Sequence, residues 1–355
     1  MGLMSRAYLC VSIDTECDKG KGWRCRKPMS FEGVRDGVAK RLHPLFSHFG
    51  AKPTYLLSPE VLLDSGCVET FRRLMPSCEL GAHLHGEYAE PHAFEPNVTS
   101  AFQRDYTPDV ERQKLTYLTD LFIRAFGHRP RSFRAGRFGL GSASLGILES
   151  LEYEVDSSVT PHMDWTSSGA PGLTFIDAPT QPYRPASCAP GRRGTSRLLE
   201  VPITIRRRAV NALPVFGAIF EPRWLRPTHG TEASIVRLAE EEIAAARRAA
   251  PGSPVVLNAM FHNVEVVPSM SPYADSEAAV WKILGRLRAL LDFARREAIA
   301  VVGLGDIPEI LDAWAVPERQ VARAHYRPRI DPHCFAFSNA LIQRPASVSL
   351  LPSSH

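Results

Sequence analysis

Residues 8–17, YLCVSIDTEC, lead an apolar run directly into two carboxylates, Asp14 and Glu16. Residues 7–13 have the composition of a buried strand, and side chains alternate between the two faces of a strand, so both acids are expected on one face. Two carboxylates that leave water together repel each other and lose hydration, so positive charge should lie opposite them. The stretch therefore predicts a first strand that delivers two acids to one edge of a sheet.

Short apolar runs alternate with longer amphipathic ones along the rest of the chain, which is typical of a β/α protein with a mainly parallel sheet. The predicted strands cover residues 7–13, 53–57, 78–84, 131–134, 153–156, 198–205, 254–261 and 299–304. The predicted helices cover residues 34–49, 108–126, 232–249 and 276–297. Seven or eight strand–helix units favour a distorted (β/α) barrel, which places its chemistry at the carboxyl ends of its strands.

We expect one barrel domain over residues 1–318 and a weakly ordered C-terminal extension over 319–355. A loop at 161–197, rich in proline, glycine and serine, is expected to rim a binding site. The composition, with 44% hydrophobic and 23% charged residues, is that of a globular protein. A net charge of +4, with arginine clusters that lack interleaved aromatic residues, gives no case for a nucleic-acid partner.

The seven cysteines form no C-x-x-C pair and are odd in number, which indicates reduced thiols rather than a disulfide framework. The chain contains no apolar run of the length that a membrane span requires, and its N-terminus lacks the pattern of a signal peptide. We therefore expect a cytoplasmic protein without a membrane span.

A second polar group ends the predicted strand at residues 78–84. The stretch ELGAHLH, residues 79–85, places His83 and His85 on one face of the strand. Two imidazoles and one carboxylate are a common ligand set for a catalytic Zn²⁺ or a similar divalent ion. An isolated His-x-His is more often a hydrogen-bonded pair, but its combination with two acids at a neighbouring strand end favours a metal site, whose cation would balance the acids.

Two further stretches follow predicted strands. In FRAGRFG, residues 133–139, Arg134 can hold a carboxylate in a fixed orientation by a two-pronged hydrogen bond. The same sequence also fits a turn with solvated arginines. In FHN, residues 261–263, His262 leaves an apolar strand and is placed to act as a general acid, although a lone histidine is more often a satisfied core residue.

The four stretches SIDTE, ELGAHLH, FRAGRFG and FHN, in this order, resemble the motifs of the polysaccharide deacetylase family, carbohydrate esterase family four. The resemblance spans roughly residues 7–310, and Asp156 with the LLEVPIT strand is similar to a bacterial branch of the nodulation-factor deacetylase type. It implies a distorted barrel, a divalent metal and hydrolysis of N- or O-acetyl groups on a sugar or glycan substrate.

The resemblance also implies a role for each residue. Asp14, oriented by Arg134, would be the catalytic base, and His262 would protonate the leaving amine. The metal would be bound by three side chains: Glu16, His83 and His85.

The motifs leave three alternatives open. Thr15 separates the two acids where the family has adjacent aspartates, so Asp14 and Glu16 could exchange roles. The family spaces its histidines four apart, so Glu87 or His92 could replace His85 as a ligand. Sibling branches open cyclic amides such as allantoin, so a metal-dependent amidohydrolase or a non-catalytic glycan-binding relative remain competing functions.

Overall fold

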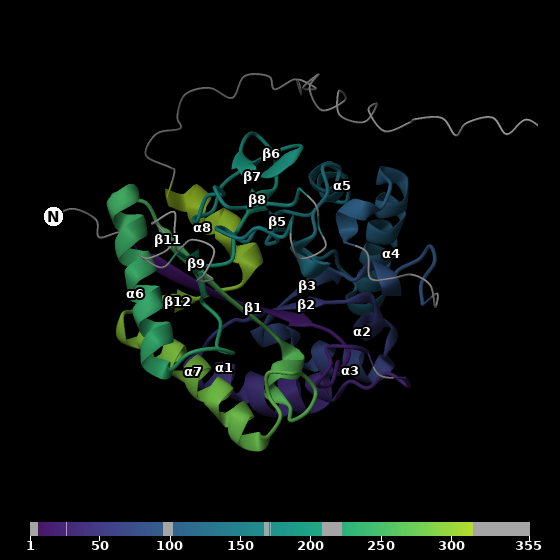
Figure 1. Cartoon of the computed structure of the whole chain (residues 1–355), viewed down its shortest axis with the longest axis horizontal. Helices are drawn as coiled ribbons and strands as arrows, with labels where there is room; N and C mark the ends of the chain where they lie inside the picture. The colour runs from purple at the N-terminus through teal and green to yellow at the C-terminus, as the bar shows by residue number, and fades with distance from the viewer. Residues whose placement is uncertain are drawn as a thin grey trace, which may run out of the picture. The chain divides into compact units, whose positions relative to one another are not determined.

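The computed structural model describes residues 6–25, 27–94, 102–166, 170, 172–207 and 222–314. A parallel sheet of seven strands in one continuous order forms its centre (Figure 1). The order is β11 (Val255–His262), β1 (Ala7–Thr15), β2 (Thr54–Leu57), β3 (Glu79–Leu84), β4 (Ser132–Ala135), β5 (Val155–Asp156) and β8 (Leu199–Glu200). An eighth strand, β12 (Ala300–Val301), pairs with the first half of β1. Each predicted strand range overlaps an observed strand, and the predicted parallel β/α architecture is confirmed.

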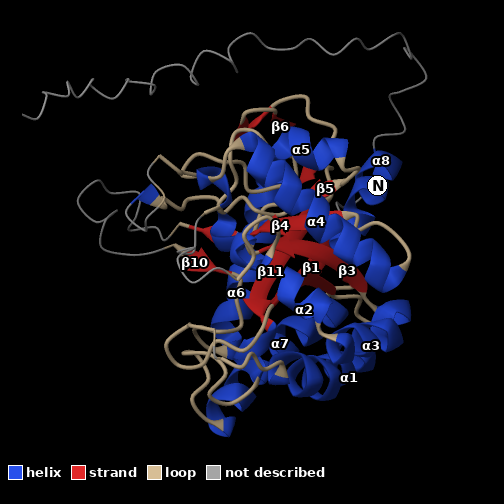
Figure 2. Ribbon diagram, turned by 90° about the vertical axis from the view of Figure 1, so that its right-hand side faces the viewer, coloured by secondary structure: helices blue, strands red, loops and turns tan. Residues whose placement is uncertain are grey.

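Helices surround the central strands (Figure 2). The longer ones are η1 (Gly33–Leu42), α1 (His43–Phe49), α2 (Pro59–Leu63), α3 (Ser65–Leu74), α4 (Pro108–Phe126), α5 (Ser144–Ser150), α6 (Glu232–Ala249), α7 (Glu277–Arg296) and α8 (Ile307–Trp314). The predicted helices 108–126 and 232–249 coincide with α4 and α6, α7 lies within the predicted 276–297, and the predicted helix at 34–49 is η1 followed by α1. Four of these helices, α2, α3, α5 and α8, have at most ten residues and were not predicted, because so few turns show little periodicity in the sequence.

The bounds of α4 follow from its end residues. The Thr107 side chain accepts a hydrogen bond from the Val110 amide, and Pro108 takes the first helical position, where no amide donor is needed. At the other end Gly127 adopts a left-handed conformation with φ 78°, which glycine tolerates without a Cβ clash. Local capping chemistry thus fixes this helix.

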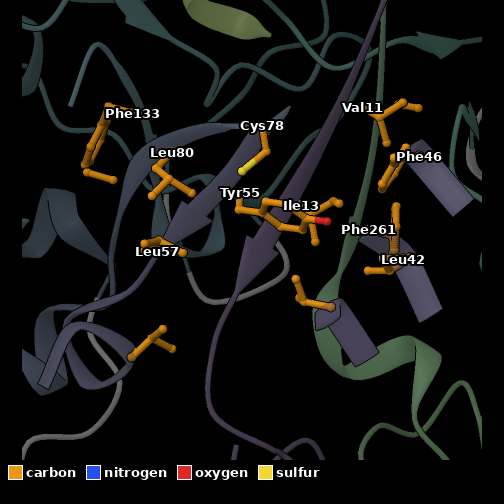
Figure 3. Packing of buried hydrophobic residues seen from close by; sticks show 14 of the residues in the cluster. Val11, Ile13, Leu42, Phe46, Tyr55, Leu57, Cys78, Leu80, Phe133 and Phe261 are labelled. Atoms are coloured by element: carbon orange, nitrogen blue, oxygen red, sulfur yellow. The ribbon is translucent and has the colours of Figure 1, made fainter. Parts of the chain in front are cut away.

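The alternation of side chains along the strands separates the helix-facing core from the barrel interior. Leu9, Val11 and Ile13 of β1 belong to the main apolar core, which packs the strands against the surrounding helices. Figure 3 shows Val11 close to Phe46 of α1, and Ile13 close to Tyr55, its partner in register on β2. The intervening residues of β1 therefore point into the barrel.

The barrel interior changes from apolar to charged along the strands. One end is filled by a second apolar cluster that includes Cys10, Val155 and Val256. Gly81 of β3 also points inward, where an added Cβ would lie 2.3 Å from the Ser132 hydroxyl oxygen. Only glycine leaves room there for β2 and β4 to approach β3 on both sides.

Irregular chain completes the barrel beside β11. The Thr204 amide donates to the Asn258 carbonyl at 3.0 Å, and the Asn258 amide donates to the Thr204 hydroxyl at 2.8 Å. These bonds join the chain after β8 to the edge strand β11, so the sheet is nearly closed. The predicted distorted barrel of seven or eight strands is confirmed.

The predicted loop at 161–197 contains a small hairpin of β6 (Pro185–Ala186) and β7 (Ala189–Arg193). A second short pair, β9 (Ile205–Arg206) with β10 (Arg223–Trp224), follows it. The predicted extension at 319–355 lies outside the described residues. Among the described helices, none combines the length and the apolar character needed to cross a membrane.

The described cysteines are mostly thiols. The reduced ones are Cys10, Cys17, Cys25, Cys67 and Cys78. Cys188 is disulfide-bonded, so the prediction of reduced thiols is wrong for this residue. The prediction rested on the number and spacing of cysteines along the sequence, which do not report which of them the fold brings together.

Candidate active site

The polar residues singled out by the sequence meet at one edge of the sheet. Asp14 and His262 occupy neighbouring positions at the ends of β1 and β11, and His83 of β3 is paired in register with Arg134 of β4. A cleft of about 340 Å³ opens at this edge. It is lined by Asp14, Glu16, Lys19, Trp23, His83, His85, Phe102, Arg137, Phe138, Trp165, His262 and Tyr273. The strand ends thus deliver the candidate residues to one cavity.

Glu16, His83 and His85 form a group that could hold a metal ion. They are buried, and one ligand atom from each lies within 4.8 Å of the others. Glu16 Oε1 lies 3.3 Å from His83 Nε2 and 3.0 Å from His85 Nε2. Ligand atoms placed about 2.0–2.2 Å from a tetrahedral Zn²⁺ lie roughly 3.3–3.5 Å apart, so the spacing of the group is close to that of a zinc site.

The second nitrogen of each histidine is already engaged. His83 Nδ1 lies 3.0 Å from the Arg134 carbonyl oxygen, and His85 Nδ1 lies 3.2 Å from Glu87 Oε1. Such outer partners accept a hydrogen bond from Nδ1, which leaves Nε2 as the nitrogen that can bind a metal. The donor set and its supporting bonds therefore fit a divalent metal.

Glu16 is held from several sides. Its amide donates to Asn263 Oδ1 at 2.9 Å, and Asn263 Nδ2 donates to its carbonyl at 3.0 Å. Its second carboxylate oxygen pairs with Lys19 Nζ at 2.8 Å. Burial opposes ionisation of Glu16, but the charges of His85 and Lys19 outweigh it and hold the pKa of Glu16 well below its usual range. The carboxylate is thus ionised and oriented before any ligand arrives.

The surroundings of His85 bear on the alternative ligands. Glu87 lies on the Nδ1 side of His85, away from the Glu16 carboxylate, and also pairs with Arg137 Nη2 at 2.9 Å. His92 is exposed and does not join the group. Burial lowers the pKa of His85, but the Glu16 and Glu87 charges raise it to about 9, so the metal-free imidazole would release its Nε2 proton when a metal binds. The geometry therefore groups His85 with Glu16 and His83, and places Glu87 as its outer partner.

Arg134 is fully buried and directs one oxygen of Asp14 away from the cleft. Its Nη1 donates to Asp14 Oδ1 at 2.6 Å, while Nη2 donates to the Ser12 and Ser157 hydroxyls at 2.7 and 2.8 Å. Burial raises the pKa of Asp14, but Arg134 and the nearby histidines bring it below its usual value. Asp14 Oδ2 is left facing His83 Nε2 and His262 Nε2, both at 3.9 Å.

The arginine is itself positioned by a polar layer inside the barrel. The Ser12 hydroxyl donates to Asn258 Oδ1 at 2.8 Å, and Asn258 Nδ2 donates to the Ser157 hydroxyl at 2.9 Å. Arg134 Nε donates to the Ser157 carbonyl at 2.7 Å. This network lies between the apolar end of the barrel and the charged cleft, and it fixes the guanidinium that orients Asp14.

His262 has an acidic partner of its own. Its Nδ1 lies 2.8 Å from Glu265 Oε1, and Glu265 is fully buried against Arg226 and Thr228. Burial opposes ionisation of Glu265, but Arg226 and His262 lower its pKa to about 2. His262 Nε2 therefore faces the cleft, 3.8 Å from Glu16 Oε1 and close to Asp14.

Sequence reasoning missed several residues of the cleft. Lys19 and Trp23 lie on the irregular segment after β1, where no periodic pattern marks a direction for side chains. Glu265 had a readable signal, because an acid three residues after His262 is the spacing at which a side chain reaches back to the start of a helical turn. Trp165 belongs to the predicted loop at 161–197, so one residue of this loop lines the cleft.

Aromatic rings form much of the cleft wall. The Trp23 ring stands edge-on to His262 with centroids 4.8 Å apart, and Phe138 stacks on Trp165 at 5.6 Å. Trp23, Arg137 and Phe138 have positive φ values of 52°, 55° and 56°. Such backbone conformations are uncommon outside glycine and concentrate at functional sites.

The comparisons with known proteins agree with the fold. No family model matches the chain, and no curated protein matches its sequence. A protein from Mycobacterium smegmatis, provisionally described as a polysaccharide deacetylase, is 18% identical with a TM-score of 0.52, and the match covers 92% of this chain and 96% of that one.

Two further structures resemble the chain. One is provisionally described as a glycoside hydrolase/deacetylase from Parabacteroides distasonis, with 12% identity and a TM-score of 0.55 over 87% of this chain and 72% of that one. The other is an allantoinase, with 14% identity and a TM-score of 0.53 over 87% of this chain and 91% of that one. At these identities the likeness concerns the fold, and the expected barrel of the polysaccharide deacetylase type is confirmed.

Proposed function

We propose that the protein is a metal-dependent hydrolase that removes an acetyl or other acyl group from the nitrogen of an amino sugar or glycan. One observation carries the proposal. The group Glu16, His83 and His85 lies in the same cleft as a buried arginine–aspartate pair and a glutamate–histidine pair. Hydrolysis of an unactivated amide requires a general base, a general acid and a means of activating water, such as a bound divalent cation.

Glu16, His83 and His85 would hold the metal, for which we propose Zn²⁺ or a similar transition-metal ion. A divalent ion bound there lowers the pKa of water toward neutrality and polarises a carbonyl oxygen. His83 and His85 need no rearrangement to serve as ligands, because both Nε2 atoms already converge on the same Glu16 oxygen.

Asp14 would act as the general base. Arg134 occupies its Oδ1, so Oδ2 is the oxygen that can accept a proton from attacking water. The lowered pKa of Asp14, in which Arg134 outweighs the effect of burial, keeps it unprotonated at neutral pH. Two contacts support this division of roles: Asp14 pairs with the arginine, and Glu16 lies against the two histidines.

His262 would act as the general acid. With Nδ1 bonded to Glu265, its Nε2 faces the cleft and can donate a proton to the departing nitrogen. Asp14 Oδ2 and His262 Nε2 are 3.9 Å apart, so both groups can reach the same amide of a substrate from neighbouring positions on the cleft floor.

The aromatic wall favours a sugar as the substrate. Trp23, Phe138, Trp165 and Tyr273 offer flat apolar surfaces around a polar floor. A pyranose ring has one apolar face and a polar rim, which suits such a cleft. The structures that resemble the chain include proteins described as deacetylases, which is consistent with this substrate class.

The test measures acetate release from N-acetylated amino sugars and oligosaccharides, before and after metal removal. The expected result is release that a chelator abolishes, that added Zn²⁺ restores, and that Asp14→Asn lowers with metal still bound. Failure of every acetylated sugar to react while metal is bound would contradict the proposal.

A second candidate is a metal-dependent amidohydrolase that opens a cyclic amide or imide, since the same base, acid and ligand set would serve that reaction. A structure described as an allantoinase shares the fold. Ring opening of allantoin without acetate release from any sugar would favour it. A third candidate, a non-catalytic glycan-binding relative, predicts purified protein that takes up no metal.

A further inference from the structure

Two thiols lie in contact directly beside the cleft. Cys17 immediately follows Glu16, and its Sγ is 3.6 Å from Sγ of Cys25. Cys17 is fully buried, whereas Cys25 is partly exposed. A disulfide requires the two sulfurs to be about 2.05 Å apart, so they need to approach by only about 1.5 Å.

We propose that Cys17 and Cys25 are a modification site that forms a reversible intramolecular disulfide on reaction with a peroxide. The partly exposed Cys25 is the thiol that the oxidant reaches, and the buried Cys17 is the one that closes the bond. This inference concerns the thiol pair alone and does not depend on the proposed hydrolase function.

The surroundings of Cys25 support a nucleophilic thiolate. The Cys17 thiol donates a hydrogen bond to Cys25 Sγ and, with Tyr88 and the Lys19 charge, lowers the pKa of Cys25 to about 6 despite partial burial. Tyr88 Oη lies 4.0 Å from Cys17 Sγ, and Lys19 Nζ lies over the Tyr88 ring at 5.4 Å. A low-pKa, accessible cysteine beside a second thiol is the arrangement of cysteines that sense oxidants.

The reaction has two balanced steps. The Cys25 thiolate attacks one oxygen of hydrogen peroxide, the O–O bond breaks, and hydroxide leaves to give a sulfenic acid on Cys25. The Cys17 sulfur then attacks the Cys25 sulfur, the S–O bond breaks, and water leaves as the disulfide forms. Two thiols are oxidised by two electrons and one peroxide is reduced to two waters.

The backbone around Cys17 decides which side moves. The Cys17 amide donates to Glu60 Oε1 at 3.0 Å, and Asn263 binds both backbone groups of Glu16. We therefore expect Cys17 to stay in place and the segment carrying Cys25 to shift. Trp23 belongs to that segment and touches His262 across the cleft, so the disulfide would displace a ring that contacts the candidate acid.

The experiment treats the reduced full-length protein with hydrogen peroxide, blocks remaining thiols with an alkylating reagent and maps the peptides without reduction. Cleavage after Glu16 separates Cys17 from Cys10, and trypsin then leaves Cys17-Asp18-Lys19 linked to Cys25-Arg26. The expected product is this linked pair, lighter by two hydrogens than the separate thiol peptides and separated again by dithiothreitol.

Three variants sharpen the result. Cys25→Ser should give no linked pair. Cys17→Ser, which keeps a hydroxyl donor beside Cys25, should leave a sulfenic acid on Cys25 that dimedone traps. Cys78→Ala, which removes a buried thiol elsewhere in the core, should form the linked pair as the unchanged protein does.

The proposal is overturned if the reagent still alkylates both cysteines after peroxide treatment, or if either sulfur is found only in a disulfide with another cysteine. Its consequence for the cleft has a separate readout. Oxidation should lower turnover by up to about 100-fold in the unchanged protein and leave Cys25→Ser unaffected. Full turnover in the linked protein would overturn the displacement of Trp23. Absence of turnover in the reduced protein would count against the hydrolase function and leave the disulfide result standing.

Discussion

Glu87 and Glu265 are the outer partners of two histidines with different proposed roles, so replacing each by glutamine should separate metal binding from proton donation. Glu87 Oε1 lies 3.2 Å from His85 Nδ1, and Glu265 Oε1 lies 2.8 Å from His262 Nδ1. Glutamine keeps the length of the side chain and one acceptor oxygen but removes the charge. Glu87→Gln should therefore affect the metal, and Glu265→Gln should affect turnover.

The magnitudes differ because the two surroundings differ. Loss of an outer partner of a metal-binding histidine typically lowers metal affinity by about 10- to 100-fold. The Glu87 side chain is 14% exposed and shares its charge with Arg137, so we expect the middle of that range, about 30-fold or roughly 2 kcal/mol. Glu265 is fully buried, and its replacement removes the group that orients the acid, so turnover should fall by about 100-fold or more.

The assay combines a competition titration of Zn²⁺ against a chromophoric chelator with turnover at saturating metal. Glu87→Gln should show weaker metal binding and near-normal turnover once saturated, and Glu265→Gln should show the reverse. Glu152→Gln, at an exposed pair with Arg129, is the matched control and should change neither. Unchanged metal affinity in Glu87→Gln, or loss of metal from Glu265→Gln, would refute the division of labour between the two histidines.

Three further predictions concern the interior and the metal. Ser157→Ala removes an acceptor from the buried Arg134, so it should lower the free energy of unfolding by about 1.5–3 kcal/mol in a denaturant titration and lower kcat at constant KM. An unchanged midpoint and kcat would contradict the proposal that this network positions Arg134. Gly81→Ala would place a Cβ 2.3 Å from the Ser132 hydroxyl oxygen on β4 and should destabilise the protein by about 1–3 kcal/mol. Gly146→Ala is the control: its added Cβ, on the exposed part of α5, would meet no atom outside the helix backbone within 4 Å, so the change should be neutral or stabilising by up to about 1 kcal/mol. Zn²⁺ at about 1,000 times its dissociation constant should stabilise the unchanged protein by about 4 kcal/mol and raise its Tm, and an equal shift in His83→Ala would place the metal elsewhere.

The residues that the sequence could predict are those at the ends of regular strands. On β1, β3, β4 and β11 the period of two assigns inward and outward faces, so Asp14, His83, Arg134 and His262 can be named as neighbours from the sequence alone. The same reasoning favours His85 over the alternatives, because it shares a face with His83. The carboxyl ends of parallel strands meet at one edge of the barrel, so four short motifs at these ends are sufficient to predict the residues that meet in the cleft.

The rest of the site lies on chain without a period. Lys19 and Trp23 follow β1 in an irregular segment, and their directions depend on contacts with the chain that follows β11, such as the bond between the Lys19 amide and the Met270 carbonyl. The charge expected opposite the two acids is supplied by Lys19 and Arg134, and of these only Arg134 belongs to a predicted strand. The roles of Asp14 and Glu16 could not be separated by spacing either, since their difference rests on which long-range partner each contacts.

The division of roles between those two acids is tested most directly by the metal content of three purified proteins. We predict one equivalent of divalent metal per chain in the unchanged protein and in Asp14→Asn, and little or none in Glu16→Gln. Acetate release should be lost in both variants. Metal lost from Asp14→Asn and retained by Glu16→Gln would contradict the account, because it would exchange the base and the ligand.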